Sequence, residues 1–309
     1  MHTIPAGLIA FDAAGPIPNC GRWKDTMPKT RDPAAYRLYI EARKFWRSKV
    51  EWQFTRQEIS SILHDVQTAS DQGDWGARAL MATFYRSGLG PLESNHVLEA
   101  DGDKMVAIVR TAVAAGQAWG YYDLGVAHEH GFGDAVQDAR IAWAYYRKAA
   151  ELGSPDAQMV LADAYLNIHR MDAEEAMRQC AFRQGHGAAA EALGIRAQGF
   201  ENFAEAVSFY QAGARFGHAG AAFAISLLFD PENWYRFKKK DQDVLENLHI
   251  LPDIERMNRY RQISDALELN PDLRLSRLDT VLPLPPTPLQ AWRNYEDALE
   301  PEQDAPPTY

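Results

Sequence analysis

The sequence has only two cysteines, Cys20 and Cys180, among its 309 residues. They are too far apart in the sequence to form a zinc knuckle, and two thiols are too few for a disulfide framework. Two alternatives therefore stay open at this point. Either the thiols are separate, with Cys180 buried in a helix, or they form one long-range disulfide.

Long apolar runs are also missing. No stretch approaches the ~20 consecutive apolar residues that a membrane-spanning helix needs. The first 20 residues lack a basic start followed by a long apolar segment, so they do not resemble a signal peptide. We expect no membrane span, and a cytoplasmic location for the chain as given. The alternative is a periplasmic location if an N-terminal signal has been removed.

Positive charge is in short supply. Lysine and arginine total 32 residues against 42 aspartates and glutamates, which gives a formal net charge of −10. This charge opposes binding to nucleic acid or to an anionic membrane surface, and it favours a basic protein partner. The single basic run, residues 236–241, is interpreted as a solvated helix end.

Catalytic signatures are absent as well. The sequence contains no nucleophile elbow, phosphate-binding loop, HExxH or CxxC motif. The best metal candidate is the pair His128 and His130, but on a helix two such residues point about 200° apart. We therefore predict no metal site, no cofactor and no enzymatic activity, and we expect His128 to lie in the core.

What the sequence does contain is an internal repeat led by glycine. Aligned copies show small residues at the fifth and tenth positions and an apolar residue at the ninth, so these positions can form one packed helical face. The copies are 43, 37, 32 and 32 residues apart, and they begin at Gly73, Gly116, Gly153, Gly185 and Gly217.

Each copy is preceded by a second helical segment, and the glycine suits the left-handed residue that ends that helix. A single helix pair cannot bury its apolar face, whereas stacked pairs share one continuous core. The sequence therefore predicts an all-α protein, an α/α solenoid of about five helix pairs.

The two ends of the chain differ from the repeats. We expect an extended arm over residues 1–34, a capping helix over 35–54, the solenoid over 55–230, and a C-terminal helix with a wrapping tail over 231–309. Prolines at 283, 285, 286 and 288 exclude a helix there and favour polyproline II. Trp292 is expected to fasten this tail, which would cover the last repeat.

Residues 119–153, "WGYYDLGVAHEHGFGDAVQDARIAWAYYRKAAELG", resemble Sel1-like repeats, which are related to tetratricopeptide repeats. The resemblance extends from Thr55 to Asp230 and implies a right-handed α/α solenoid of Sel1-like helix pairs. The chain is similar to a bacterial subgroup of Sel1-like proteins in three segments: the aromatic N-terminal helix, "RYRQISDAL" and "LPLPPTPLQAW". Members of that subgroup are often encoded beside phospholipase effectors of type VI secretion and act as their immunity proteins.

This resemblance implies a non-enzymatic immunity protein that binds a cognate toxic effector, a phospholipase, and blocks its active site. The concave face, or the long loop at residues 86–102, would perform the occlusion. The alternative is a Sel1-like adaptor that assembles a bacterial signalling or envelope complex.

The predicted binding surface follows from the repeat. Positions 4, 7 and 11 of each glycine-led helix point away from the shared core, and aromatic anchors beside carboxylates are typical of protein recognition. Trp119 is expected to be the main exposed anchor. The alternative is that these residues merely face solvent or the folded-back tail. The row consists of Trp119, Tyr122, Val126, Asp156, Met159, Asp163, Glu191 and Ile195.

Overall fold

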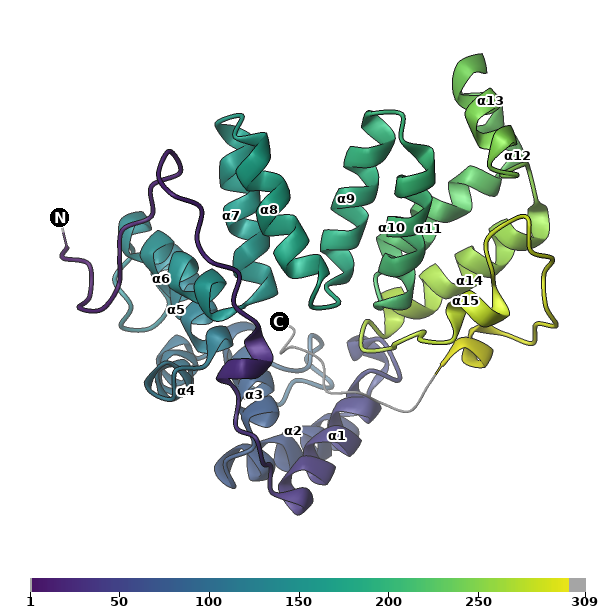
Figure 1. Cartoon of the computed structure of the whole chain (residues 1–309). Helices are drawn as coiled ribbons and strands as arrows, with labels where there is room; N and C mark the ends of the chain where they lie inside the picture. Colours follow the sequence, from purple (N-terminus) through teal and green to yellow (C-terminus); the bar gives the residue numbers. More distant parts are fainter. Residues whose placement is uncertain (1, 300–309) are drawn as a thin grey trace. The chain divides into compact units, whose positions relative to one another are not determined.

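The computed structural model describes residues 2–299, and the regular elements in this range are helices (Figure 1). An isolated bridge between Leu89 and Leu98 is the one β-type pairing among the described residues. The described chain divides into two compact units, residues 2–181 and 182–299. The all-α class and the α/α solenoid that the repeat predicts are confirmed.

Unit 1 contains the N-terminal arm, a capping helix and the first helix pairs. Its elements are η1 (Trp23–Thr26), α1 (Pro33–Trp46), η2 (Glu51–Gln53), α2 (Arg56–Asp71), α3 (Trp75–Ser87), α4 (Gly102–Ala114), α5 (Ala118–His130), α6 (Ala139–Leu152), α7 (Pro155–Asn167) and α8 (Met171–Phe182), whose last residue belongs to unit 2.

Unit 2 contains the remaining repeat helices and the C-terminal extension. Its elements are α9 (Gly187–Gly199), α10 (Phe203–Arg215), α11 (Ala219–Phe229), α12 (Pro231–Trp234), α13 (Lys239–Asn247), α14 (Ile254–Leu269), α15 (Leu278–Val281) and η3 (Tyr295–Ala298).

Each repeat glycine ends one helix and prepares the next. All five have a positive φ, between +72° and +101°, as predicted for residues that close a helix in the left-handed region. The residue after the glycine then caps the following helix in several copies. Asp74 accepts a hydrogen bond from the amide of Ala77, and Ser154 accepts one from Ala157.

The small residue at the tenth position receives an aromatic ring from the next helix. A Cβ on Gly125 would lie 2.7 Å from the ring of Tyr146, and one on Gly194 would lie 2.5 Å from Tyr210. The two tyrosines occupy equivalent places in different copies. A larger tenth residue would push this ring away, which explains the small-residue pattern.

The N-terminal arm lies against α6, α7 and α8. The ring of Phe11 stacks on Trp143 at 5.2 Å, and the Arg147 guanidinium donates to the carbonyl of Ala10 at 3.0 Å. Arg170 donates to the carbonyls of Ala13 and Gly15. Backbone carbonyls of the arm are therefore paired with side chains of the repeats, which fixes its path.

The two cysteines form a disulfide, so the interpretation of Cys20 and Cys180 as separate thiols is wrong. Their Cα atoms are 5.6 Å apart although 160 residues separate them in the sequence. The large separation in the sequence gave no sign of this pairing, because the two cysteines meet only when the arm folds back across the repeats. Cys180 is buried in α8, as expected.

The C-terminal tail packs on the last helices of unit 2. The backbone amide of Leu275 donates to the carbonyl of Arg215 on α10, and further along the Arg259 guanidinium donates to the carbonyl of Gln290 at 2.9 Å. Trp292 donates from Nε1 to the side chain of Gln262 at 3.1 Å. The tail thus follows α10 first and then α14.

A buried polar network joins the tail to the repeats. The hydroxyl of Tyr260 donates to Oε1 of Gln211 at 2.6 Å, and Nε2 of Gln211 donates to the carbonyl of Leu282 at 3.1 Å. Because both side chains are buried, each needs this partner. The network sets the register of α10, α14 and the tail.

None of the helices in residues 2–299 combines the length and the apolar character needed to cross a membrane.

Candidate protein-binding surface

The predicted row begins in unit 1 on α5 and α7. Tyr122, Val126, Asp156 and Met159 are half-buried, and Asp163 is exposed. These side chains are partly accessible, although Tyr122 and Val126 also pack against a buried cluster of the core. They therefore form a surface of mixed aromatic, apolar and acidic character on this unit.

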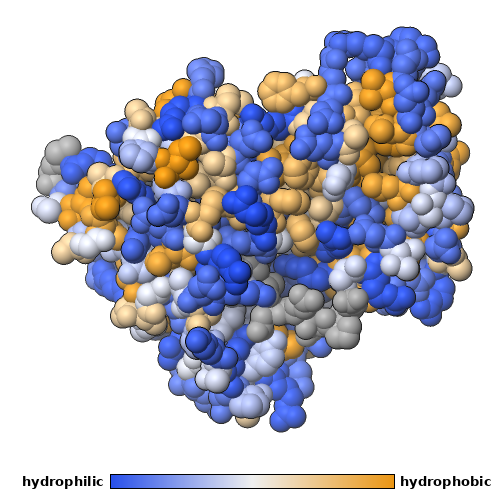
Figure 2. All heavy atoms as spheres, viewed as in Figure 1, coloured by the Kyte–Doolittle hydropathy of each residue, from blue (hydrophilic) through white to orange (hydrophobic). Residues whose placement is uncertain are grey.

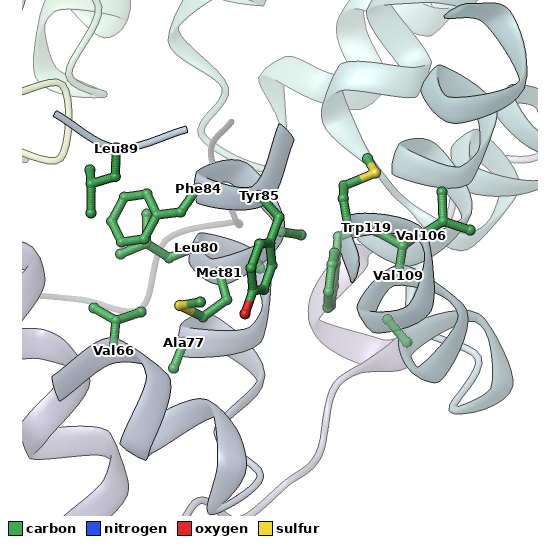
Figure 3. Close-up of a cluster of buried hydrophobic side chains, with 14 of the residues drawn as sticks. Val66, Ala77, Leu80, Met81, Phe84, Tyr85, Leu89, Val106, Val109 and Trp119 are labelled. Atoms are coloured by element: carbon green, nitrogen blue, oxygen red, sulfur yellow. The ribbon is translucent and has the colours of Figure 1, made fainter. Parts of the chain in front are cut away.

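Trp119 is not part of that surface, so its expected exposure is wrong. Its side chain is 3% exposed and belongs to the same buried cluster as Tyr85 and Val109 (Figure 3). The indole Nε1 donates to Oε1 of Gln117 at 2.7 Å, which satisfies its polar atom inside the core. In this copy the side chain at position 4 packs against Tyr85 and Val109 rather than facing solvent.

The acidic end of the row is partly neutralised. The exposed Asp163 lies 3.4 Å from a guanidinium nitrogen of Arg178, and Arg178 also pairs with the buried Glu174 at 2.7 Å. Exposed pairs of this kind contribute little to stability because water screens them. Their effect here is to hold Arg178 beside the row.

In unit 2 the row runs over α9 and α11. Ile195 is 57% exposed, and a carboxylate oxygen of Glu191 lies 2.8 Å from Nε2 of His218. Burial, and then the charge of Glu191, raises the pKa of Tyr210 to about 12. Apolar side chains are prominent on the face of unit 2 seen in Figure 2.

Phe223 extends this row and was not among the predicted residues. Phe223 lies on α11 and is 48% exposed. It holds the seventh position of the fifth copy, counted from Gly217, the position that Tyr122 and Met159 hold in their own copies. Continuing the row by one copy would have identified it.

Acidic and tyrosine side chains lie next to the row of unit 1. The Tyr146 hydroxyl donates to Glu129 at 2.5 Å, and its ring centroid is 5.6 Å from that of Tyr122. Burial, followed by the bond to Glu129, raises the pKa of Tyr146. Burial raises the pKa of the Asp123 carboxyl well above its usual range; the charge of Arg86 opposes this shift and that of Asp156 adds to it.

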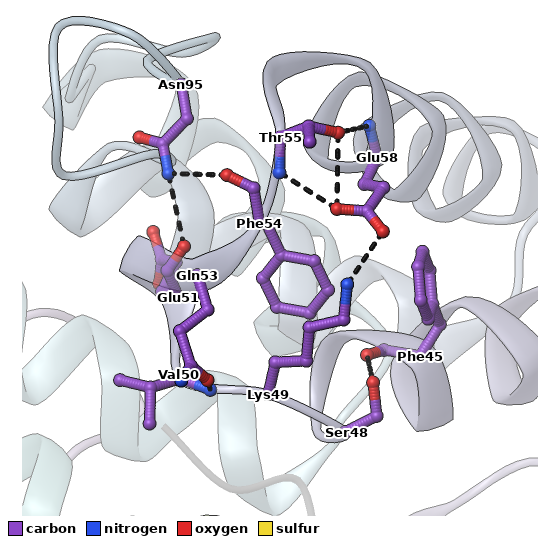
Figure 4. A network of polar contacts seen from close by, with 10 residues as sticks. All are labelled: Phe45, Ser48, Lys49, Val50, Glu51, Gln53, Phe54, Thr55, Glu58 and Asn95. Carbon is purple, nitrogen blue, oxygen red and sulfur yellow. Dashed lines mark hydrogen bonds and ion pairs between the residues drawn. The ribbon is translucent and has the colours of Figure 1, made fainter.

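The long loop at residues 86–102 is held firmly in place. Asn95 is buried and donates from Nδ2 to the carbonyls of Glu51 and Phe54, at 3.2 and 3.0 Å (Figure 4). Its Oδ1 accepts from the backbone amide of Leu92 at 3.0 Å. One side chain therefore joins the loop to the segment that precedes α2.

Replacing Asn95 with alanine is expected to free this loop. Three hydrogen bonds disappear, and the carbonyls of Glu51 and Phe54 each lose one donor, which should cost about 2 kcal/mol. Hydrogen exchange at the amides of residues 89–98 should accelerate, while exchange in α10 of unit 2 stays unchanged. Unaltered protection of the loop amides in the variant would show that Asn95 does not hold the loop.

No group of three or more His, Cys, Asp or Glu side chains suited to a metal ion occurs within residues 2–299. His128 is buried, stacks on the ring of Tyr145 at 5.4 Å, and has Nδ1 2.8 Å from the carbonyl of Val136. It therefore packs in the core, as its place in the repeat predicts. His130, two residues on, is exposed.

Comparison with solved structures identifies similar proteins from Pseudomonas aeruginosa. PA5086 is 28% identical with a TM-score of 0.70, and the match covers 89% of this chain and 97% of that one. Immunity protein Pa5087 is 26% identical with a TM-score of 0.68, and the match covers 87% and 95%. The chain therefore resembles an immunity protein over most of its length.

Immunity protein PA5088 from the same organism is 24% identical, with a TM-score of 0.62 over 87% of this chain and 95% of that one, and it supports the fold. A family model described as a domain of unknown function, DUF6396, matches residues 231–307. No curated protein matches the sequence.

Proposed function

We propose that this protein is an immunity protein that binds a cognate toxic effector and neutralises it without catalysis. The observation that carries the proposal is the likeness to immunity protein Pa5087, at 26% identity over 87% of this chain. The partly exposed row on each unit supplies a surface of the kind that protein recognition uses.

We further propose that the effector is a phospholipase of type VI secretion and that binding occludes its active site. The resemblance of the repeats and of the proline-rich tail supports this choice. The net charge of −10 supports a basic effector surface, since opposite charges accelerate encounter. The α5–α7 row, the α9–α11 row and the anchored loop at residues 86–102 are the surfaces available for occlusion.

We infer from the disulfide the cellular compartment in which the protein meets its effector. Disulfides persist in oxidising surroundings and are rare in a reducing cytosol. The Cys20–Cys180 bond therefore favours the bacterial periplasm over the cytoplasm as the place where the effector is met. Alkylation of free thiols in fractionated cells tests this point, because a periplasmic protein should carry no reactive cysteine before reduction.

Growth protection tests the proposal directly. Cells that express the effector encoded beside this gene should die without the protein and survive with it. Ile195→Asp should abolish protection, because it places a charge on an exposed apolar side chain of the α9–α11 row. Ile254→Asp is the matched control, since Ile254 is 61% exposed in the same unit but lies outside the row.

Loss of protection in both variants, or in neither, would remove Ile195 from the interface. Failure of the wild-type chain to protect against this effector would contradict the immunity role. Capture of several envelope or signalling proteins without an effector would instead support the adaptor.

A further inference from the structure

Asp123 breaks the repeat pattern at a buried position. It is the eighth residue of its copy, and the other four copies place an apolar residue there, namely Leu80, Val160, Ala192 and Ala224. Packing of the solenoid therefore does not require a carboxyl at this position. An apolar residue would serve the core at least as well.

The carboxyl of Asp123 is also incompletely paired. The residue is 1% exposed, and its Oδ1 has no hydrogen-bond partner. Burying an unpartnered polar atom is costly, and such atoms in native proteins commonly point to a function. Burial favours the neutral form of this carboxyl; the charge of Arg86 opposes that effect, and the charge of Asp156 adds to it.

The surroundings of Asp123 are suited to a cation. Asp156, Asp123 and Glu129 all act electrostatically on Tyr122, and Tyr122 packs on the ring of Tyr146. Aromatic faces and carboxylates are the groups that bind guanidinium and ammonium ions in proteins. Tyr122 and Asp156 are half-buried and Glu129 is exposed, so the cluster extends from Asp123 to the surface of unit 1.

We propose that Asp123 and its neighbours Tyr122 and Asp156 bind the cationic end of an arginine or lysine side chain from the protein partner. A long side chain with a terminal charge, bound at the half-buried Tyr122 and Asp156, would supply the donor that Oδ1 of Asp123 lacks. The net negative charge of the chain favours encounter with a basic partner. The identity of the partner rests on the proposed function, whereas the chemistry of the site does not.

The first experiment needs no effector. Nα-acetyl-L-arginine methylamide is titrated against the full chain, with the citrulline analogue as the uncharged isostere, and binding is read from the shift in Tm. The wild type should prefer the arginine compound by about tenfold, as expected for a charge-assisted bond. Asp123→Asn should lose that preference. Asp71→Asn, which removes an exposed charge on α2 of the same unit, should keep it.

Equal binding of the two compounds by the wild type, or an unchanged preference in Asp123→Asn, would overturn the proposal. The Tm without ligand separates this role from a structural one. Asp123→Leu introduces the residue that the first copy has at the same repeat position, Leu80. The Tm of this variant should therefore equal or exceed that of the wild type. A marked fall in Tm would mean that the carboxyl serves the fold, which also overturns the proposal.

The second experiment uses the effector. Asp123→Leu should bind it at least about tenfold more weakly than the wild type, despite undiminished stability. Full affinity in this variant, beside tight binding by the wild type, would refute the cation site and leave the immunity role intact. Absence of effector binding by the wild type would instead refute the immunity role, while the arginine titration would still decide the site.

Discussion

Replacing Cys20 with serine is expected to lower the free energy of unfolding by about 4 kcal/mol. The disulfide closes a loop of 160 residues, and a cross-link over so long a loop removes much of the conformational freedom of the unfolded chain. Cys20 is the exposed partner, so serine there adds no cavity and no buried hydroxyl. Urea unfolding followed by circular dichroism measures the change.

Reduction provides the matched control for this prediction. Wild-type protein in dithiothreitol should unfold at the same urea concentration as Cys20→Ser, and the reductant should not affect the variant. Contacts of the arm, such as Arg147 with Ala10, remain available in both forms. Equal stability of oxidised and reduced wild type would show that the bond does not support the fold.

Replacing Gly153 with alanine is expected to cost about 4 kcal/mol. Gly153 has a φ of +101°, a conformation that costs a residue with a Cβ about 1 to 2 kcal/mol. The added Cβ would also lie 2.3 Å from backbone atoms of Arg22 and Trp23 in the arm. Backbone cannot rotate away as a flexible side chain does, so overpacking adds about 1 to 3 kcal/mol.

Gly116→Ala is the matched control, since Gly116 occupies the same place in another copy. Its φ is +72°, but nothing lies within 4 Å of an added Cβ. The expected cost is about 1 to 2 kcal/mol, from the backbone alone. Equal losses of stability in the two variants would mean that the arm does not press on Gly153.

Most of the predicted features of the fold followed from the repeat. The five glycines, the small tenth residues and the core place of His128 all follow from periodicity and were confirmed. Such features depend on residues close together in one helix pair. Local spacing is therefore enough to predict them.

Features that depend on how distant segments meet were harder to predict. The pairing of Cys20 with Cys180 requires knowing that the arm folds back across α8. The burial of Trp119 requires knowing that Tyr85 and Val109 pack against it in the folded chain. The spacing of residues within one helix indicates neither the cysteine pairing nor the burial of this tryptophan.

The role of the row in binding stays a prediction, and its accessibility varies: Ile195 is exposed, whereas Tyr122 is half-buried. Phe223 could have been found by extending the same count to the last copy. Asp123 was visible as the one charged residue at the eighth position. Its missing hydrogen-bond partner, which makes it notable, is a property of the folded chain.

The most direct test of the immunity role is inhibition of the effector by purified protein. The phospholipase activity of the proposed cognate effector is titrated with the full oxidised chain. Activity should fall linearly to zero at one molecule per effector, as expected for a dissociation constant of about 1 nM or tighter. Undiminished lipase activity at a large molar excess of this protein would contradict the account.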